Sequence, residues 1–166
     1  GVALVDGAGN ELWRWTVFDD EEAIPLDSGD RDECNFHRGF FGPGTVDWTH
    51  GNSVERVAGE KAFLLSLRNL NRIMKIDENS GEVLWHIGKG LDFDWIGEET
   101  SETKWFGIQH HAQILPNGNL LMFDNHFPSN GGGPWSRGLE LALDEENLTA
   151  ELVWEFRVPY TMANGS

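Results

Sequence analysis

Two adjacent histidines, His110 and His111, stand where the sequence predicts the start of a β-strand, in the run Gln109-His110-His111-Ala112. Apolar residues on both sides of Pro116-Asn117-Gly118-Asn119 indicate a strand, a tight turn and a second strand. A neutral imidazole nitrogen is a nucleophile and can form a covalent intermediate with a substrate. Because they stand at the start of a strand, we expect the histidines at the end of a sheet, not in the middle of its exposed face.

An earlier segment repeats this design with other polar residues. His50 and Asn52 open a strand, a turn follows around residues 58–61, and the returning strand ends in Arg68. Arginine stays cationic at all working pH values, and its planar fork suits the oxygens of a sulfate or phosphate. Asn52 adds two hydrogen-bond donors. We expect His50, Asn52, Arg68 and His110 to converge on one small anionic group.

A repeat of about 70 residues indicates how these strands are organised. Trp13, Trp85 and Trp154 each follow an aspartate, a short polar turn and the start of a strand. A strand-only unit that returns at this period predicts an all-β fold, a β-propeller of four-stranded antiparallel blades. The innermost strands of successive blades would line a central channel and bring the polar strand ends together.

The length of 166 residues accommodates two to three blades at this period. A propeller closes its ring with roughly four to eight blades. Residues 1–166 are therefore expected to be an internal fragment of a single β-propeller domain, with the missing blades supplied by the rest of the chain or by other copies. The alternative is a complete small domain, since a chain of this length can bury a core of its own.

Composition excludes several classes of function. The net charge of −16 argues against binding to nucleic acid or to anionic membranes, both of which need basic patches. No apolar run approaches the ~20 residues that cross a bilayer. The single Cys34 provides neither an internal disulfide nor a cysteine-based zinc site.

Three motifs in order resemble those of the arylsulfate sulfotransferases, which are six-bladed β-propellers. They are His50-Gly51-Asn52 at the head of an inner strand, Ser66-Leu67-Arg68 at the end of the returning strand, and Gln109-His110-His111-Ala112 in the next blade. The resemblance implies transfer of a sulfuryl group from an aryl sulfate to a phenol. It implies a periplasmic or secreted location. It implies neither a metal nor a nucleotide cofactor.

The same resemblance assigns roles to individual residues. His110 corresponds to the histidine that is transiently sulfurylated, while His50, Asn52 and Arg68 would bind the sulfuryl oxygens. This pattern agrees with the chemistry of the residues, because fixed donors stabilise the charge on a group in transfer. Aromatic residues before the two strand heads are candidates to stack on the phenolic rings: Trp48, Trp105 and Phe106.

Side-chain alternation along a strand predicts that His111 faces away from His110 and is structural. His126 lies beside Asp124-Asn125 and is a further candidate to face the channel. Arg72 and Arg137 each precede a strand that ends in aspartate, and we expect them to form ion pairs between blades.

Two other classes of function stay open. In the first, a divalent metal for hydrolysis is bound by His50, His110, His111 and Asp124. In the second, the chain is a non-catalytic propeller that binds a ligand or a partner on its faces.

Overall fold

The computed structural model describes residues 1–18, 47, 49–97, 105–125 and 136–157. Within these ranges the regular structure is β-strand, apart from the 3-10 turn η2 (Arg68–Leu70). The strands are β1 (Val2–Val5), β2 (Glu11–Trp15), β3 (Gly51–Arg56), β4 (Ala62–Leu67), β5 (Arg72–Asp77), β6 (Val83–Ile87), β7 (Asp94–Ile96), β8 (His110–Ile114), β9 (Leu120–Asp124), β10 (Arg137–Asp144) and β11 (Thr149–Arg157). The prediction of an all-β chain is confirmed.

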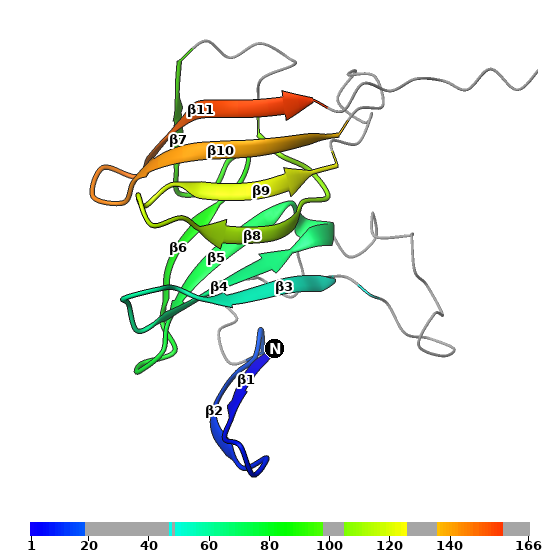
Figure 1. The fold of residues 1–166 in the computed structure, drawn as a ribbon, viewed down its shortest axis with the longest axis vertical. Coiled ribbons are helices and arrows are strands. Elements are labelled where there is room, and N and C mark those ends of the chain that lie inside the picture. The colour runs from blue at the N-terminus through cyan, green and yellow to red at the C-terminus, as the bar shows by residue number, and fades with distance from the viewer. Residues whose placement is uncertain (19–46, 48, 98–104, 126–135, 158–166) are drawn as a thin grey trace, which may run out of the picture.

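The strands form three sheets within the described ranges, which follow one another along the chain as blades (Figure 1). Blade A is the hairpin β1-β2, blade B is the antiparallel sheet β3-β4-β5-β6, and blade C contains the antiparallel strands β8-β9-β10-β11. The predicted four-stranded antiparallel blades are thus confirmed. Blade C differs in one respect, because β7 pairs in parallel with β11 and adds a fifth strand.

The repeated tryptophans occupy the same place in the three blades. Trp13, Trp85 and Trp154 lie on β2, β6 and β11, each on the second strand of a β-hairpin. Each hairpin also has a β-bulge beside the tryptophan. On the partner strand the register shifts directly after the residue that pairs with the tryptophan, between Leu4/Val5, Lys75/Ile76 and Glu140/Leu141. The sequence period therefore corresponds to a structural repeat.

An aspartate fixes the turn of each of these hairpins. In each case the aspartate Oδ1 accepts two backbone N–H groups from within the next four residues, at 2.7 to 3.0 Å; the aspartates are Asp6, Asp77 and Asp144. Aspartate favours such turns because its short side chain mimics a backbone carbonyl. The hydrogen bonds stabilise the carboxylate and lower the pKa of all three groups, with the largest effects from Asn10, Ser80 and Asn147 respectively.

Blade B is buried on both faces. Leu65, Leu67, Met74 and Ile76 pack with Val2 and Trp15 of blade A. On the other face Leu64, Ile73, Trp85 and Ile87 pack with Leu120, Met122, Leu139 and Leu141 of blade C. One core therefore joins blade A to blade B, and the other joins blade B to blade C. The inner strands β3 and β8 also contact each other.

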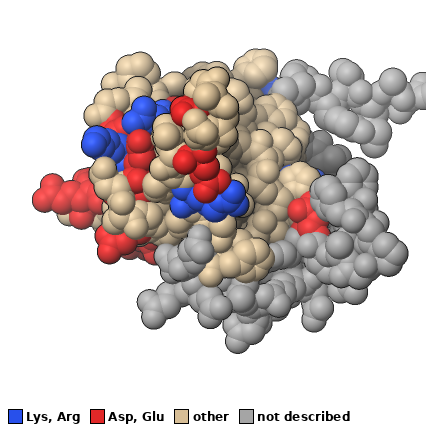
Figure 2. Space-filling model, turned by 90° about the horizontal axis from the view of Figure 1, so that it is seen from below, with Lys and Arg blue, Asp and Glu red and all other residues tan. Residues whose placement is uncertain are grey.

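The described surface mixes charges of both signs. Figure 2 shows acidic and basic side chains in adjacent groups with uncharged residues between them. Among the described ion pairs, Arg56 Nη2 and Glu78 Oε2 lie 2.8 Å apart. Among the described residues, no helix has the length and apolar character needed to cross a membrane.

Lys75 makes an ion pair between blades B and C. It lies on β5 with 3% of its surface exposed. Its Nζ lies 2.8 Å from Glu145 Oε2, at the β10-β11 turn, and 2.7 Å from Glu60 Oε2, at the β3-β4 turn. Burial by itself would lower the pKa of Lys75, but the hydrogen bonds to Glu145 and Glu60 outweigh it and raise the pKa above its ordinary value. The charged form therefore stabilises the contact between the blades.

We expect Lys75→Ala to destabilise the protein by about 2 kcal/mol in chemical denaturation, because it removes charge-assisted hydrogen bonds to two carboxylates. The contribution of Lys75 should be complete below the pKa of an unfolded lysine and should disappear as pH rises through the raised pKa of the folded state. Arg56→Ala is the matched control. Its pair with Glu78 is exposed, so its loss should cost less than about 1 kcal/mol. Equal effects of both substitutions would contradict this account of Lys75.

Candidate functional site

His50 and Arg68 are neighbours at the end of the β3-β4 pair. The backbone N–H of Arg68 donates to the carbonyl of His50 at 3.1 Å, and the N–H of Asn69 donates to the carbonyl of Thr49 at 3.3 Å. The Nδ1 of His50 contacts the carboxylate of Asp47, which orients the imidazole. His50 has a φ of 46° in the left-handed region, so the chain turns sharply as it enters β3.

Side chains of β3 bind the backbone of β8 and join the inner strands of blades B and C. The Nδ2 of Asn52 donates to the carbonyl of Gln109 at 2.7 Å. The Oγ of Ser53 accepts from the N–H of Ala112 at 3.3 Å, and the carboxylate of Glu55 accepts from the N–H of Ile114. The two strands therefore have a fixed register, which places Asn52 next to the residue that precedes His110.

Glu55 is one of the ionisable groups at this contact between the inner strands. Desolvation raises its pKa above the ordinary value, against the lowering effects of the Ile114 N–H and of the charge of His111. The carboxyl therefore holds a proton more readily than an exposed glutamate does.

Gln109 is completely buried and bridges the two blades in the opposite direction. Its Nε2 lies 3.0 Å from Ser66 Oγ, 3.3 Å from the carbonyl of Leu67 and 3.0 Å from the carbonyl of Arg72. All three partners belong to the β4-β5 corner of blade B. Asn52 and Gln109 thus form reciprocal links, each from the side chain of one blade to the other.

The peptide that precedes His110 is held from several sides. Asn71 Oδ1 accepts the N–H of Ile108 at 2.6 Å, and Asp124 Oδ1 accepts the N–H of Gly107 at 2.9 Å. Asn125 Nδ2 donates to the carbonyl of Ile108 at 2.9 Å. Ile108 has a φ of 53°, which is rare for a β-branched residue and is maintained by these contacts.

His111 does not obey simple alternation with His110. It has a φ of 54°, and the pairing of β8 with β9 shifts from His110↔Phe123 to Gln113↔Leu121. Two residues of β8 stand opposite one residue of β9, which is a β-bulge. The premise of a regular strand is wrong at this point. His111 is exposed, and its charge acts on Glu55 of β3.

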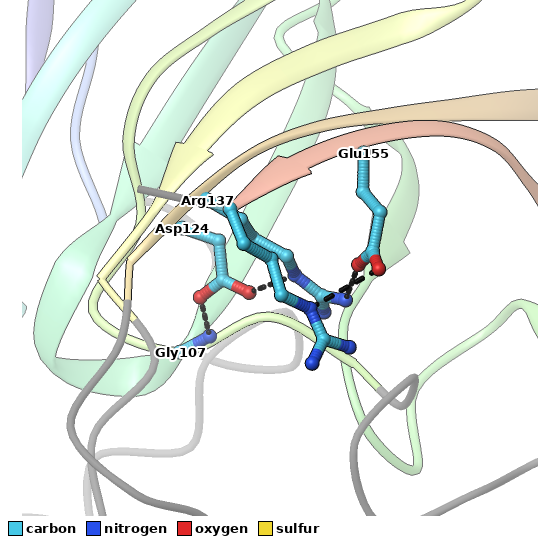
Figure 3. A network of polar contacts seen from close by, with 5 residues as sticks. Gly107, Asp124, Arg137 and Glu155 are labelled. Carbon is cyan, nitrogen blue, oxygen red and sulfur yellow. Dashed lines mark hydrogen bonds and ion pairs between the residues drawn. The ribbon is translucent and has the colours of Figure 1, made fainter. Parts of the chain in front are cut away.

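A buried charge network holds the end of blade C beside this segment (Figure 3). Asp124 and Arg137 are both fully buried, and Arg137 Nε lies 2.8 Å from Asp124 Oδ2. Arg137 Nη1 lies 2.8 Å from Glu155 Oε2. The prediction of an ion pair between blades is wrong for Arg137, because β9, β10 and β11 are neighbours in one sheet.

This pairing also bears on the proposed metal ligands. The two carboxylate oxygens of Asp124 bind Arg137 and the Gly107 N–H. Within the part of the chain that the structure describes, no group of three or more His, Cys, Asp or Glu side chains is arranged to hold a metal ion.

A cavity of about 270 Å³ lies between blade A and β3. It is lined by Gly1, Val2, Trp15, Val17, Thr49, Gly51, Asn52, Ser53, Val54, Leu65 and Leu67. Asn52 therefore borders this cavity and also binds Gln109, the residue before β8.

The predicted polar residues lie on adjoining elements at one end of the inner strands. His50 and Asn52 belong to the head of β3, Arg68 follows β4, and His110 begins β8, where Asn52 binds the preceding residue. The predicted aromatic contacts have a different environment. Trp105 and Phe106 are 9% and 4% exposed and belong to the core between blades B and C, which leaves little ring surface for a ligand. Trp48 and His126 lie outside the described residues.

Sequence reasoning did not identify Asn71, Asp124 and Asn125 as residues that hold the segment before His110. The available signal was their position, since Asp124 ends β9 and Asn125 follows it directly, while Asn71 precedes β5. Polar side chains at strand ends commonly satisfy backbone groups of the adjoining loop.

The comparison with protein families gives a match to the arylsulfotransferase (ASST) model over residues 1–166. The search among curated proteins gives no match. The family match covers every element described above, including both inner strands and the ends that carry the histidines. It supports an arylsulfotransferase-type function in general. The chain belongs to the arylsulfotransferase family.

Proposed function

We propose that this protein moves a sulfuryl group from an aryl sulfate to a phenolic acceptor through a covalent intermediate on His110. The observation that carries the proposal is the hydrogen bond from Asn52 to the carbonyl of Gln109, at 2.7 Å. It fixes the head of β3, with His50 and Asn52, against the residue before His110. The backbone N–H of Arg68 donates to the carbonyl of His50 at 3.1 Å, which supports a shared site for these residues.

The first step is an attack by His110 on the sulfur of the aryl sulfate. Nδ1 of His110 lies 3.1 Å from the carbonyl of Ile108, so Nε2 is the nitrogen left to react. An N–S bond forms while the S–O bond to the aryl group breaks, and the phenolate leaves with the electron pair. In the second step the oxygen of an acceptor phenol attacks the sulfur, the N–S bond breaks, and the phenolic proton passes to solvent. Two displacements replace one difficult displacement.

The remaining residues act on the sulfuryl oxygens. Charge spreads over three oxygens as the group is transferred, by analogy with phosphoryl transfer. Fixed donors that meet this charge are more effective than water, because they need no reorganisation during the reaction. Arg68 supplies a bidentate cation, while Asn52 and His50 supply further donors. The contact of His50 Nδ1 with the carboxylate of Asp47, and the hydrogen bond that Arg68 Nη1 donates to Asn69 Oδ1, hold both side chains in place before substrate binds.

The nucleophile is tested by mixing the intact protein with an aryl sulfate in the absence of acceptor. We expect a burst of about one phenol per active site, followed by a stall, with one sulfuryl group on His110. His110→Asn should abolish the burst and the adduct. Mass spectrometry at neutral to alkaline pH locates the adduct.

His111→Asn is the matched control. Asparagine tolerates the left-handed φ of 54° at this position, so the bulge should persist and the burst should be retained. An adduct on His111 would overturn the assignment of the nucleophile. Turnover without any histidine adduct would exclude the two-step route.

Arg68→Lys tests the role of the cation. A lysine keeps the charge but loses the bidentate fork, so we expect kcat to fall about 10²-fold while KM changes little. Arg56→Lys, at the other end of β3, should leave both constants unchanged. An unchanged kcat/KM in Arg68→Lys would show that Arg68 acts only in packing between strands.

A further inference from the structure

Asn125 and the carbonyl of Ile108 form a compact group around one ring nitrogen of His110. Asn125 Nδ2 lies 2.9 Å from the Ile108 oxygen and 3.0 Å from His110 Nδ1. His110 Nδ1 lies 3.1 Å from the same oxygen. The three atoms are thus nearly equidistant, and both side chains are partly buried.

We propose that Asn125 is a positioning residue that, through the Ile108 carbonyl, keeps the proton of neutral His110 on Nδ1 and the lone pair on Nε2. This inference rests on the proposed function, in which Nε2 attacks sulfur. It adds the residue that selects the reactive tautomer. Asn125 itself touches neither the substrate nor the sulfur.

The chemistry of the three groups distinguishes two arrangements. A carbonyl oxygen has two lone pairs, so Ile108 can accept from Asn125 and from His110 Nδ1–H together. In the other arrangement Asn125 donates to an unprotonated Nδ1, which places the proton on Nε2 and removes the lone pair needed for attack. After attack the ring is an N-sulfuryl imidazolium whose Nδ1 still carries its proton. Only the first arrangement pairs that proton both before and after the step.

The position of the Ile108 carbonyl is itself imposed by the surroundings. Ile108 has a left-handed φ of 53°, which an isoleucine does not adopt without support. Asn71 binds its N–H at 2.6 Å, and Asn125 binds its oxygen at 2.9 Å. Asp124 binds the N–H of Gly107, the preceding residue, and is in turn fixed by Arg137 (Figure 3). The unusual backbone turns the Ile108 oxygen toward the imidazole, and Asn125 is the side chain that holds it there.

The tautomer can be measured without turnover. The intact protein is labelled with ¹⁵N-histidine and its long-range ¹H–¹⁵N spectrum is recorded at about pH 8, where histidine is ordinarily neutral. The His110 signals are assigned by their loss in His110→Gln. We expect a protonated Nδ1 and an unprotonated Nε2 in the native protein. Asn125→Ala and the similarly sized Asn125→Leu should shift His110 toward the Nε2–H form, which free histidine prefers.

The same variants should lower kcat for release of phenol by roughly 10- to 100-fold with little change in KM, as loss of an orienting partner does at metal-binding histidines. Asn117→Ala is the matched control, because Asn117 lies in the turn at the other end of the β8-β9 hairpin and contacts Glu140. It should change neither the tautomer nor kcat.

Each outcome decides one question. A native His110 protonated on Nε2 would overturn the inference, and so would an unchanged tautomer in both Asn125 variants. If a variant fails to fold, the native spectrum alone still tests the assignment of the proton. A protein with the expected tautomers but no sulfuryl transfer would support the role of Asn125 and overturn the proposed function.

Discussion

The buried side chain of Gln109 is the interaction on which the candidate site depends. Gln109 precedes β8, and its side chain donates hydrogen bonds to polar atoms of the β4-β5 corner. Its backbone carbonyl accepts a hydrogen bond from Asn52. The buried Nε2 of Gln109 needs acceptors, because an unpaired donor in a protein interior costs free energy. Blade C therefore has one favourable placement against blade B, and that placement brings the head of β3 next to His110.

A second constraint acts within blade C. Asp124 and Arg137 are buried together, and neither charge would be tolerated there without the other. Asp124 also accepts the N–H of Gly107. The charge network of blade C therefore holds the chain two residues before Gln109. The sequence led us to expect an ion pair of Arg137 between blades, because the order of residues does not show which strands are neighbours in a sheet. Strand pairing places Arg137 opposite Asp124, and that register is a property of the folded sheet.

The parts of the structure that sequence predicts well are those set by local chemistry. Asp77 and its two equivalents bind N–H groups only a few residues away, and a tryptophan follows on the next strand each time, so the repeated hairpin can be predicted from the sequence. The sequence also indicates the polar strand ends, since His50, Arg68 and His110 stand where strands begin or end. The bulge at His111 could not be predicted in this way. Neither Ile108 nor His111 is a glycine or an asparagine, the residues that normally indicate a left-handed backbone.

The left-handed backbone before His110 is held by residues of two blades. The isolated segment before β8 would relax to ordinary φ values, since the partners that hold the backbone of Gly107 and Ile108 are distant in sequence. Support comes from Asn71 of blade B together with Asp124 and Asn125 of blade C. One of these residues, Asn125, also lies 3.0 Å from His110 Nδ1. Because neither blade carries the whole set, the geometry around His110 exists only when the two blades are packed together.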